Sequence, residues 1–245
     1  MSLGTIEEGP AAMIPNIAFP AALAALLLLA SCGTQSAKKS QATDQANDGV
    51  ATLAENPVDA KLLLAAAEEF ETIAETSFSA DVAAREKMIA DAAKAVAEVT
   101  GSASPKLRAR LQTGVADILK AHRTNEPADL AIASIEVYRD LISAVPGQRK
   151  IPVHVGLLEY AGFRFDADAQ AKPPRFADME KTAAFAEQQW AEIKLRKEID
   201  ILADGFEASL SEMGLAARSR DVARARAAAK VELDMVDELE AAFGR

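Results

Sequence analysis

The sequence contains few of the residues that disulfide, metal and redox chemistry require. It has one cysteine and two histidines in 245 residues, and aromatic residues make up only 5% of the chain. A single cysteine excludes a disulfide scaffold and any metal or iron–sulfur site with several cysteine ligands. The low aromatic content also argues against a β-sandwich or a β-barrel, whose strands favour aromatic and β-branched side chains.

Basic residues are scarce as well, with 27 Lys and Arg against 37 Asp and Glu, for a net charge of −10. Phosphate binding requires a basic surface, so we expect no nucleic-acid partner. The sequence also lacks a phosphate-binding loop, a serine-hydrolase elbow, a zinc-peptidase motif and a c-type haem attachment motif. We therefore predict no catalytic residue, no cofactor and no metal site, and an enzyme is the interpretation that the sequence supports least.

An apolar run near the N-terminus is the most specific feature that is present. Residues 17–30 read IAFPAALAALLLLA, without a charge. A membrane-spanning helix needs about 20 such residues, so this run is too short to span a bilayer and fits the apolar core of an export signal. The run ends in the tetrapeptide Leu29-Ala30-Ser31-Cys32.

This tetrapeptide resembles the lipobox of bacterial lipoprotein precursors. The resemblance implies that the thiol of Cys32 is acylated with a diacylglycerol and that residues 1–31 are a signal peptide, removed just before Cys32. The alternative is a buried cysteine at the end of a core helix, but the polar, irregular sequence after Cys32 does not favour it. The lipid anchor would make a membrane the first expected partner.

Two details refine this prediction. Signals normally begin with a basic residue, whereas residues 1–12 carry Glu7 and Glu8 and no base. We interpret residues 1–12 as an over-assigned start or an added segment, with Met13 as the true first residue. The residue after the cysteine is Gly33 rather than the aspartate associated with inner-membrane retention. We therefore expect the periplasmic side of the outer membrane more than the inner membrane.

Residues 32–57 form the predicted tether. They are rich in Ser, Thr, Gln, Asn and Asp and have almost no large apolar side chain, a composition typical of disordered linkers. A flexible coil of this length has a root-mean-square reach of roughly 25–30 Å. The remaining residues, 58–245, keep 32 acidic and 25 basic residues.

The apolar residues of 58–245 recur with the spacing of successive amphipathic helices. No segment shows a long alternation of apolar and polar residues that would predict a strand. The chain has 54 alanines, and alanine is the strongest intrinsic helix former. We predict an all-α fold, an antiparallel bundle of about seven helices. The expected spans are 59–78, 79–101, 105–122, 127–145, 151–165, 176–213 with a kink or break near 196–205, and 222–243, with a turn at Gly214.

The segment 151–195 contains the candidate binding residues. Tyr160 and Arg164 are four residues apart and share a helix face, while Glu159 adds a carboxylate and Trp190 follows in a later helix. A structural ion-pair network is one interpretation, because an arginine and carboxylates among apolar residues need pairing when they are buried. A polar pocket for a small ligand is the other. Trp190 is either a core residue or a stacking wall for a ligand.

The two histidines carry weaker predictions. His122 lies on an apolar stripe and could be a metal or haem ligand in a bundle core, but its place at a helix C-terminus equally predicts a charge-favoured capping residue. His154 and Glu159 are five residues apart, a spacing that does not place them on one helix face.

Two functional hypotheses follow. The first is a non-catalytic interaction or scaffold lipoprotein that presents the helical domain to a protein partner of the cell envelope. The alternative is a module that binds a small ligand or a metal in a polar pocket of the 151–195 region.

Overall fold

Short polar residues and prolines set the helix starts. Asp59, Asp81, Ser104 and Asp221 each accept a hydrogen bond from a backbone N–H in the first turn of the following helix, at 2.8–3.2 Å. These side chains satisfy donors that a helix cannot pair internally. Prolines occupy the first positions of two helices, where the missing N–H costs nothing.

The computed structural model describes residues 58–147 and 149–245. Within these ranges it contains eight α-helices, one short 3₁₀ helix and no strand, which confirms the predicted all-α fold. The elements are α1 (Ala60–Thr76), α2 (Val82–Thr100), α3 (Pro105–Thr124), α4 (Pro127–Ala144), α5 (Val153–Gln170), α6 (Phe176–Ile193), η1 (Lys197–Ile199), α7 (Ala203–Ser219) and α8 (Val222–Gly244).

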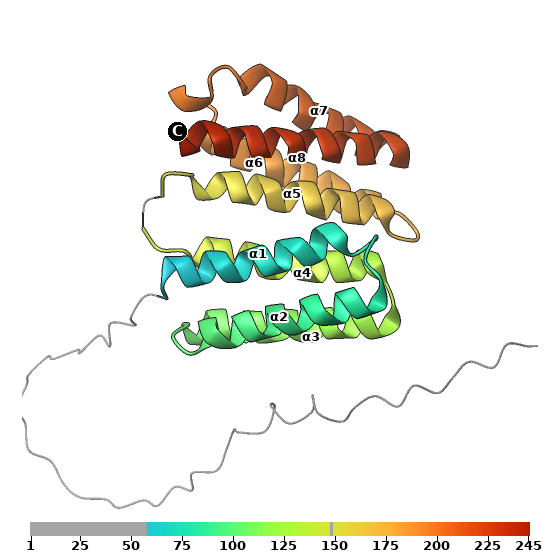
Figure 1. Ribbon diagram of the computed structural model, residues 1–245. Coiled ribbons are helices and arrows are strands. Elements are labelled where there is room, and N and C mark those ends of the chain that lie inside the picture. Colours follow the sequence, from blue (N-terminus) through green and yellow to red (C-terminus); the bar gives the residue numbers. More distant parts are fainter. Residues whose placement is uncertain (1–57, 148) are drawn as a thin grey trace, which may run out of the picture. The chain divides into compact units, whose positions relative to one another are not determined.

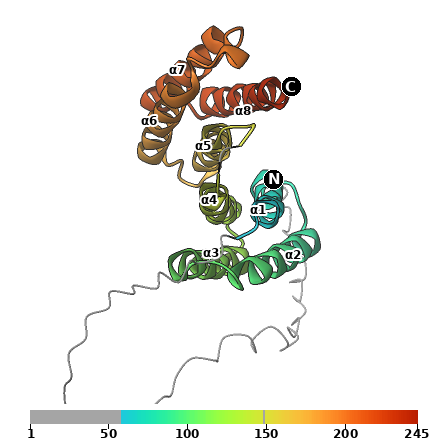
Figure 2. The same cartoon turned by 90° about the vertical axis from the view of Figure 1, so that its left-hand side faces the viewer.

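The helices form two sets of four with the same pairing (Figures 1 and 2). In the first set α1 packs against α2 and α4, and α3 packs against α2 and α4. In the second set α5 packs against α6 and α8, and α7 packs against α6 and α8. The contact of α4 with α5 joins the two sets. Consecutive helices run antiparallel, as their short connections require.

One apolar core runs through both sets. Its largest fully buried side chains include Phe70, Phe165 and Phe206. Gly162 of α5 packs closely against α8, because a Cβ atom at this position would come within 2.6 Å of the Cδ2 of Leu233. A larger residue at this position would require the facing side chains of α8 to move.

The number of helices exceeds the prediction by one, because the run 176–213 is divided. The chain leaves α6 after Ile193 and passes through η1 before α7 begins at Ala203, so the predicted break near 196–205 is present. The predicted turn at Gly214 is wrong: Gly214 is buried inside α7. The turn lies instead at Arg220, whose backbone is left-handed with φ 55°.

Another expected boundary is also wrong. We expected the second helix to begin after Ser79, but α2 begins at Val82 and is capped by Asp81. Asp81 accepts from Ala84 N at 2.8 Å, whereas the Ser79 hydroxyl donates back to the carbonyl of Thr76. The serine thus completes the end of α1 rather than starting α2.

The predicted signal peptide (1–31), the acylated Cys32 and the tether (32–57) lie outside the described residues. In the part of the chain that is described, none of the helices has the length and apolar character needed to cross a membrane.

Candidate functional site

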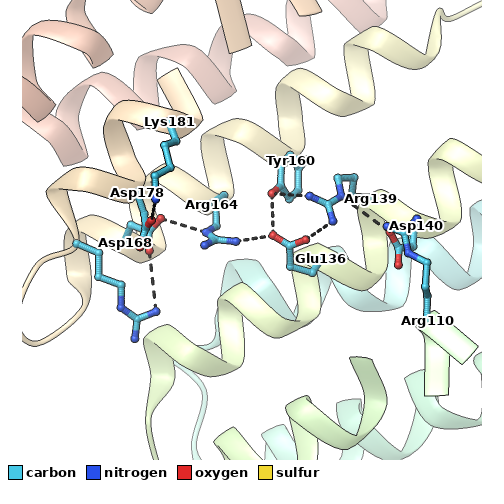
Figure 3. Close-up of polar contacts among 10 residues, drawn as sticks. Arg110, Glu136, Arg139, Asp140, Tyr160, Arg164, Asp168, Asp178 and Lys181 are labelled. Carbon is cyan, nitrogen blue, oxygen red and sulfur yellow. Dashed lines mark hydrogen bonds and ion pairs between the residues drawn. The ribbon is translucent and has the colours of Figure 1, made fainter. Parts of the chain in front are cut away.

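Tyr160 and Arg164 lie together on α5 and face α4, as their spacing predicts (Figure 3). The Tyr160 hydroxyl donates to Glu136 Oε1 at 2.7 Å and accepts from Arg139 Nη1 at 3.1 Å. Arg139 also pairs with Glu136 Oε2 at 2.5 Å, and its guanidinium lies 5.0 Å from the centre of the Tyr160 ring. Arg164 donates to the same Glu136 carboxylate. Glu136 therefore receives a hydroxyl and two guanidinium groups.

Arg164 extends these contacts to the C-terminal end of α5. Its Nε donates to Asp168 Oδ2 at 3.0 Å, and the Asp168 side chain is completely buried. Arg175 Nη1 lies 4.0 Å from the other Asp168 oxygen and also pairs with Asp129 at the start of α4. At the other end, Arg139 lies 3.9 Å from Asp140. We call Glu136, Arg139, Tyr160, Arg164 and Asp168 the α4–α5 network.

Charge in the α4–α5 network is balanced by direct partners. Burial raises the pKa of Asp168, and the adjacent Arg164 opposes that rise. Burial raises the pKa of Tyr160 to about 12, with the Glu136 carboxylate adding to the rise, so the hydroxyl stays protonated and donates. This mutual pairing is the arrangement expected of a structural network that holds two helices together.

Glu159 faces a different part of the molecule from its neighbour Tyr160. It accepts a hydrogen bond from the Tyr138 hydroxyl of α4, and the Glu71 carboxyl group of α1 is a near neighbour. Burial raises the pKa of Glu159 to about 8, and the nearby Glu71 carboxylate raises it further, as does Glu240 of α8.

Glu232 of α8 adds a second buried carboxyl next to this group. Its side chain is fully buried, and neither carboxylate oxygen has a hydrogen-bond partner. Burial raises its pKa well above the usual range, and the Glu159 charge adds to the effect. We call Glu71, Tyr138, Glu159, Glu232 and Glu240 the carboxyl cluster. It joins α1, α4, α5 and α8 with no arginine or lysine among its members.

A groove of about 450 Å³ opens beside the carboxyl cluster, between α1, α5 and α8. Glu71 and Glu159 contribute to its wall, together with Phe163. Its lining includes six carboxylates and only two basic residues, Arg226 and Lys230. Arg226 lies 3.6 Å from the Asp166 carboxylate in the wall.

Trp190 lies apart from the other candidate residues, between α6 and α7. It is buried, and its ring stacks on Phe206 with centres 4.6 Å apart. Its indole N–H donates to Glu207 at 3.2 Å, and Lys194 pairs with the same carboxylate at 3.3 Å. These contacts are those of a core residue with one satisfied polar atom. A shallow hollow of about 320 Å³ lies beside the ring.

The histidines lie apart from these groups. His122 is in the last turn of α3, where its Nε2 is 3.8 Å from Glu86. The Nδ1 of His154 lies 3.0 Å from the side-chain oxygen of Gln189. Within residues 58–147 and 149–245, no group of three or more His, Cys, Asp and Glu side chains is arranged to hold a metal ion.

Sequence reasoning thus identified two of the five members of the α4–α5 network, Tyr160 and Arg164. It missed Asp168 on α5 and both members on α4. Glu136 and Arg139 are three residues apart on one helix, and Arg164 and Asp168 are four apart. Such spacings are common on exposed helix faces, so they did not reveal which pairs would be buried. Glu232 and Tyr138 were also missed, because nothing in the local sequence separates a buried glutamate or tyrosine from an exposed one.

Comparison with protein-family models, with curated proteins and with solved structures gives no match to this chain.

Proposed function

We propose that this protein is an exported lipoprotein, anchored in the bacterial envelope through an acylated Cys32, whose helical domain is a non-catalytic interaction or scaffold module. The tetrapeptide that ends in the single cysteine of the chain carries this proposal. A compact helical unit that begins 26 residues further on supports it. So does the α4–α5 network, because Tyr160 and Arg164 are occupied by protein partners and need no ligand to balance them.

The anchor is tested by mass spectrometry of the protein produced in a bacterium. A mature chain that starts at Cys32 and carries a diacylglycerol supports the proposal. Cys32→Ala should leave an unprocessed chain without the added lipid mass, whereas the neighbouring change Gly33→Ala should process normally. If Cys32→Ala still gives a membrane-bound protein of mature size, the lipoprotein assignment is wrong. Separation of the two membranes on a density gradient then tests the expected outer-membrane location.

The groove beside the carboxyl cluster favours a second candidate function, the binding of a small cationic ligand. Its volume suits a small molecule, and its excess of carboxylates suits an amine more than an anion. Spermidine is a suitable probe in isothermal titration calorimetry. Binding that is lost in Asp237→Asn, which changes an acidic side chain of the groove, and kept in Glu207→Gln, on the far side of the second set, would favour this function. Absence of heat for the wild-type chain at millimolar spermidine would exclude this ligand class.

A further inference from the structure

The connection between α6 and α7, residues 194–202, exposes two large aliphatic side chains to an unusual degree. Leu195 is 87% exposed and Ile201 is 92% exposed. In the described part of the chain, the other exposed large hydrophobic side chains range from 37% to 53%. An aliphatic side chain that is almost entirely in water gains nothing from the fold, and its position at the end of a connection suits contact with an external apolar phase.

Basic side chains flank Leu195, whereas Ile201 lies between Asp200 and Leu202. Lys194, Arg196 and Lys197 lie within the same connection, which also carries Glu198 and Asp200. The connection is therefore net positive in a domain whose 32 acids outnumber its 25 bases. Arg196 is paired with Glu198 at 3.0 Å, and Lys194 is paired with Glu207 at 3.3 Å. This combination of protruding aliphatics and local positive charge complements an anionic lipid surface.

The α6–α7 connection and the α4–α5 connection both contact the C-terminal residues of α8 and Arg245. The Arg196 guanidinium lies 5.6 Å from the ring centre of Phe243, near the C-terminus. Lys150, from the connection between α4 and α5, donates to the terminal Arg245 carbonyl at 3.1 Å. Lys150 and its neighbour Arg149 place two bases at this end, with no acid between residues 145 and 152.

The chain also enters the domain at this end. Because the helices alternate in direction, the start of α1, the α4–α5 connection, the α6–α7 connection and the C-terminus lie at one end of the helices (Figure 1). Only 25 residues, 33–57, separate Cys32 from the first described residue, Val58. An anchor at Cys32 would therefore keep this end of the domain close to the lipid that holds it.

From these observations we infer that the α6–α7 connection is a membrane-contacting element, in which Leu195 and Ile201 enter the interface of an anionic bilayer and the adjacent bases meet lipid headgroups. The inference rests on the proposed function, because the anchor supplies the bilayer. A tethered domain is present at high effective concentration beside its own membrane, so a contact that is weak for a free domain becomes populated. The contact would fix which end of the domain faces the membrane and which faces the periplasm.

The test uses the full chain, purified from bacterial membranes, with one introduced thiol. Ile201→Cys places the thiol in the connection, and Val82→Cys provides a matched control, because Val82 is 53% exposed at the other end of the helices. Each thiol is labelled with an environment-sensitive fluorophore, and the chains are reconstituted in vesicles of phosphatidylethanolamine and phosphatidylglycerol. Brominated lipids then serve as quenchers within the bilayer.

We expect a blue shift and quenching of the label at position 201 and neither effect at position 82. Adding Leu195→Asp to the Ile201→Cys chain should abolish the quenching, and vesicles without phosphatidylglycerol or with high salt should reduce it. Equal signals at both positions, or no signal at 201 in a chain that floats with the vesicles, would overturn the inference. A blue shift at 201 that depends on protein concentration without lipid would overturn it in favour of a second copy of this chain.

The same preparation distinguishes failure of the anchor from failure of this inference. An acylated Cys32 has no free thiol, so peptide mapping should find the fluorophore only at position 201. Label on Cys32 would contradict the proposed acylation, while the signal at position 201 would still report whether the connection contacts lipid.

Discussion

The α4–α5 network and the carboxyl cluster lie on neighbouring faces of α5. Their buried ionisable side chains are stabilised in opposite ways. In the network, Glu136 and Asp168 are matched by Arg139 and Arg164. In the carboxyl cluster, acids meet other acids and a tyrosine, and burial raises their pKa values. The network keeps its charges by pairing them, whereas the cluster is stable when its carboxyl groups are protonated. Tyr160 belongs to the α4–α5 network, and the adjacent residue Glu159 belongs to the carboxyl cluster.

The largest difference in stability between the two regions is expected when a cation is removed from the α4–α5 network. Arg164→Ala leaves the fully buried Asp168 with only the more distant Arg175, at 4.0 Å. We expect a loss of about 3–5 kcal/mol in the free energy of unfolding, the usual cost of an unpaired buried charge. Urea titration followed by circular dichroism measures the change.

Lys230→Ala is the control for this variant, because Lys230 pairs with Asp234 on the surface, where both side chains are mostly exposed. Its effect should be small. Equal losses in the two variants would show that the α4–α5 network contributes no more than a surface ion pair.

Removing an acid from the carboxyl cluster should have the opposite sign. Glu232→Met replaces a fully buried carboxyl group without partners by an apolar side chain of similar length. We expect a gain of about 1–3 kcal/mol at pH 8, since an unsatisfied buried polar group carries a cost of that size. Thermal unfolding at pH 8 measures it, and a loss of stability would indicate that Glu232 has a partner that the structure does not contain.

The pH dependence of stability should also separate the two regions. The pKa of Glu159 is raised to about 8 by burial and by Glu71, so the folded state binds a proton that the unfolded state releases above about pH 4.5. The contribution to stability is therefore complete below pH 4.5 and is lost as the pH rises through 8. The slope of the free energy of unfolding approaches about −1.4 kcal/mol per pH unit for one such group.

Glu159→Gln should flatten this slope between pH 5 and 8, because its amide does not titrate. Denaturant titrations at several pH values measure the slope in the wild-type chain and in the variant. Stability that rises between pH 5 and 8 in the wild-type chain would contradict the raised pKa values of the carboxyl cluster.

The smallest contrast concerns the two tyrosines. Tyr160→Phe removes a hydroxyl that bridges Glu136 and Arg139, and we expect a loss of about 1 kcal/mol that hardly varies between pH 5 and 9. Tyr138→Phe removes the donor to Glu159. Its cost should grow as the pH rises and Glu159 ionises, because a hydrogen bond to a charged acceptor is stronger. If the loss in free energy of unfolding had the same pH dependence in both variants, the proposed electrostatic difference between the two regions would be wrong.

The sequence predicts the helices better than the groups that they bring together. Ser104 and Pro105 mark a helix start by local chemistry, and the structure places α3 there. Gly214 misleads because glycine inside a helix costs only about 1 kcal/mol, which tertiary packing outweighs. Trp190 lies on the buried stripe of α6, which agrees with the core interpretation of the two that the sequence left open.

The candidate site depends on how helices pair, and local sequence does not contain that information. Tyr160 and Arg164 were correctly placed on one face because they lie on one helix. Their partner Glu136 lies 24 residues before Tyr160, and only the packing of α4 against α5 joins them. Adjacent residues on a helix point about 100° apart, so Glu159 could share neither their face nor their partners.

The arrangement of the helices in two consecutive sets has a consequence for the order of folding. Residues 60–144 contain every helix of the first set, and residues 153–244 contain every helix of the second. Each set closes on itself through contacts that are local in sequence, a topology associated with rapid folding. Because a chain is synthesised from its N-terminus, the first set can complete its packing while the second is still being made. It would then present the finished surface of α4 as the template on which α5 assembles.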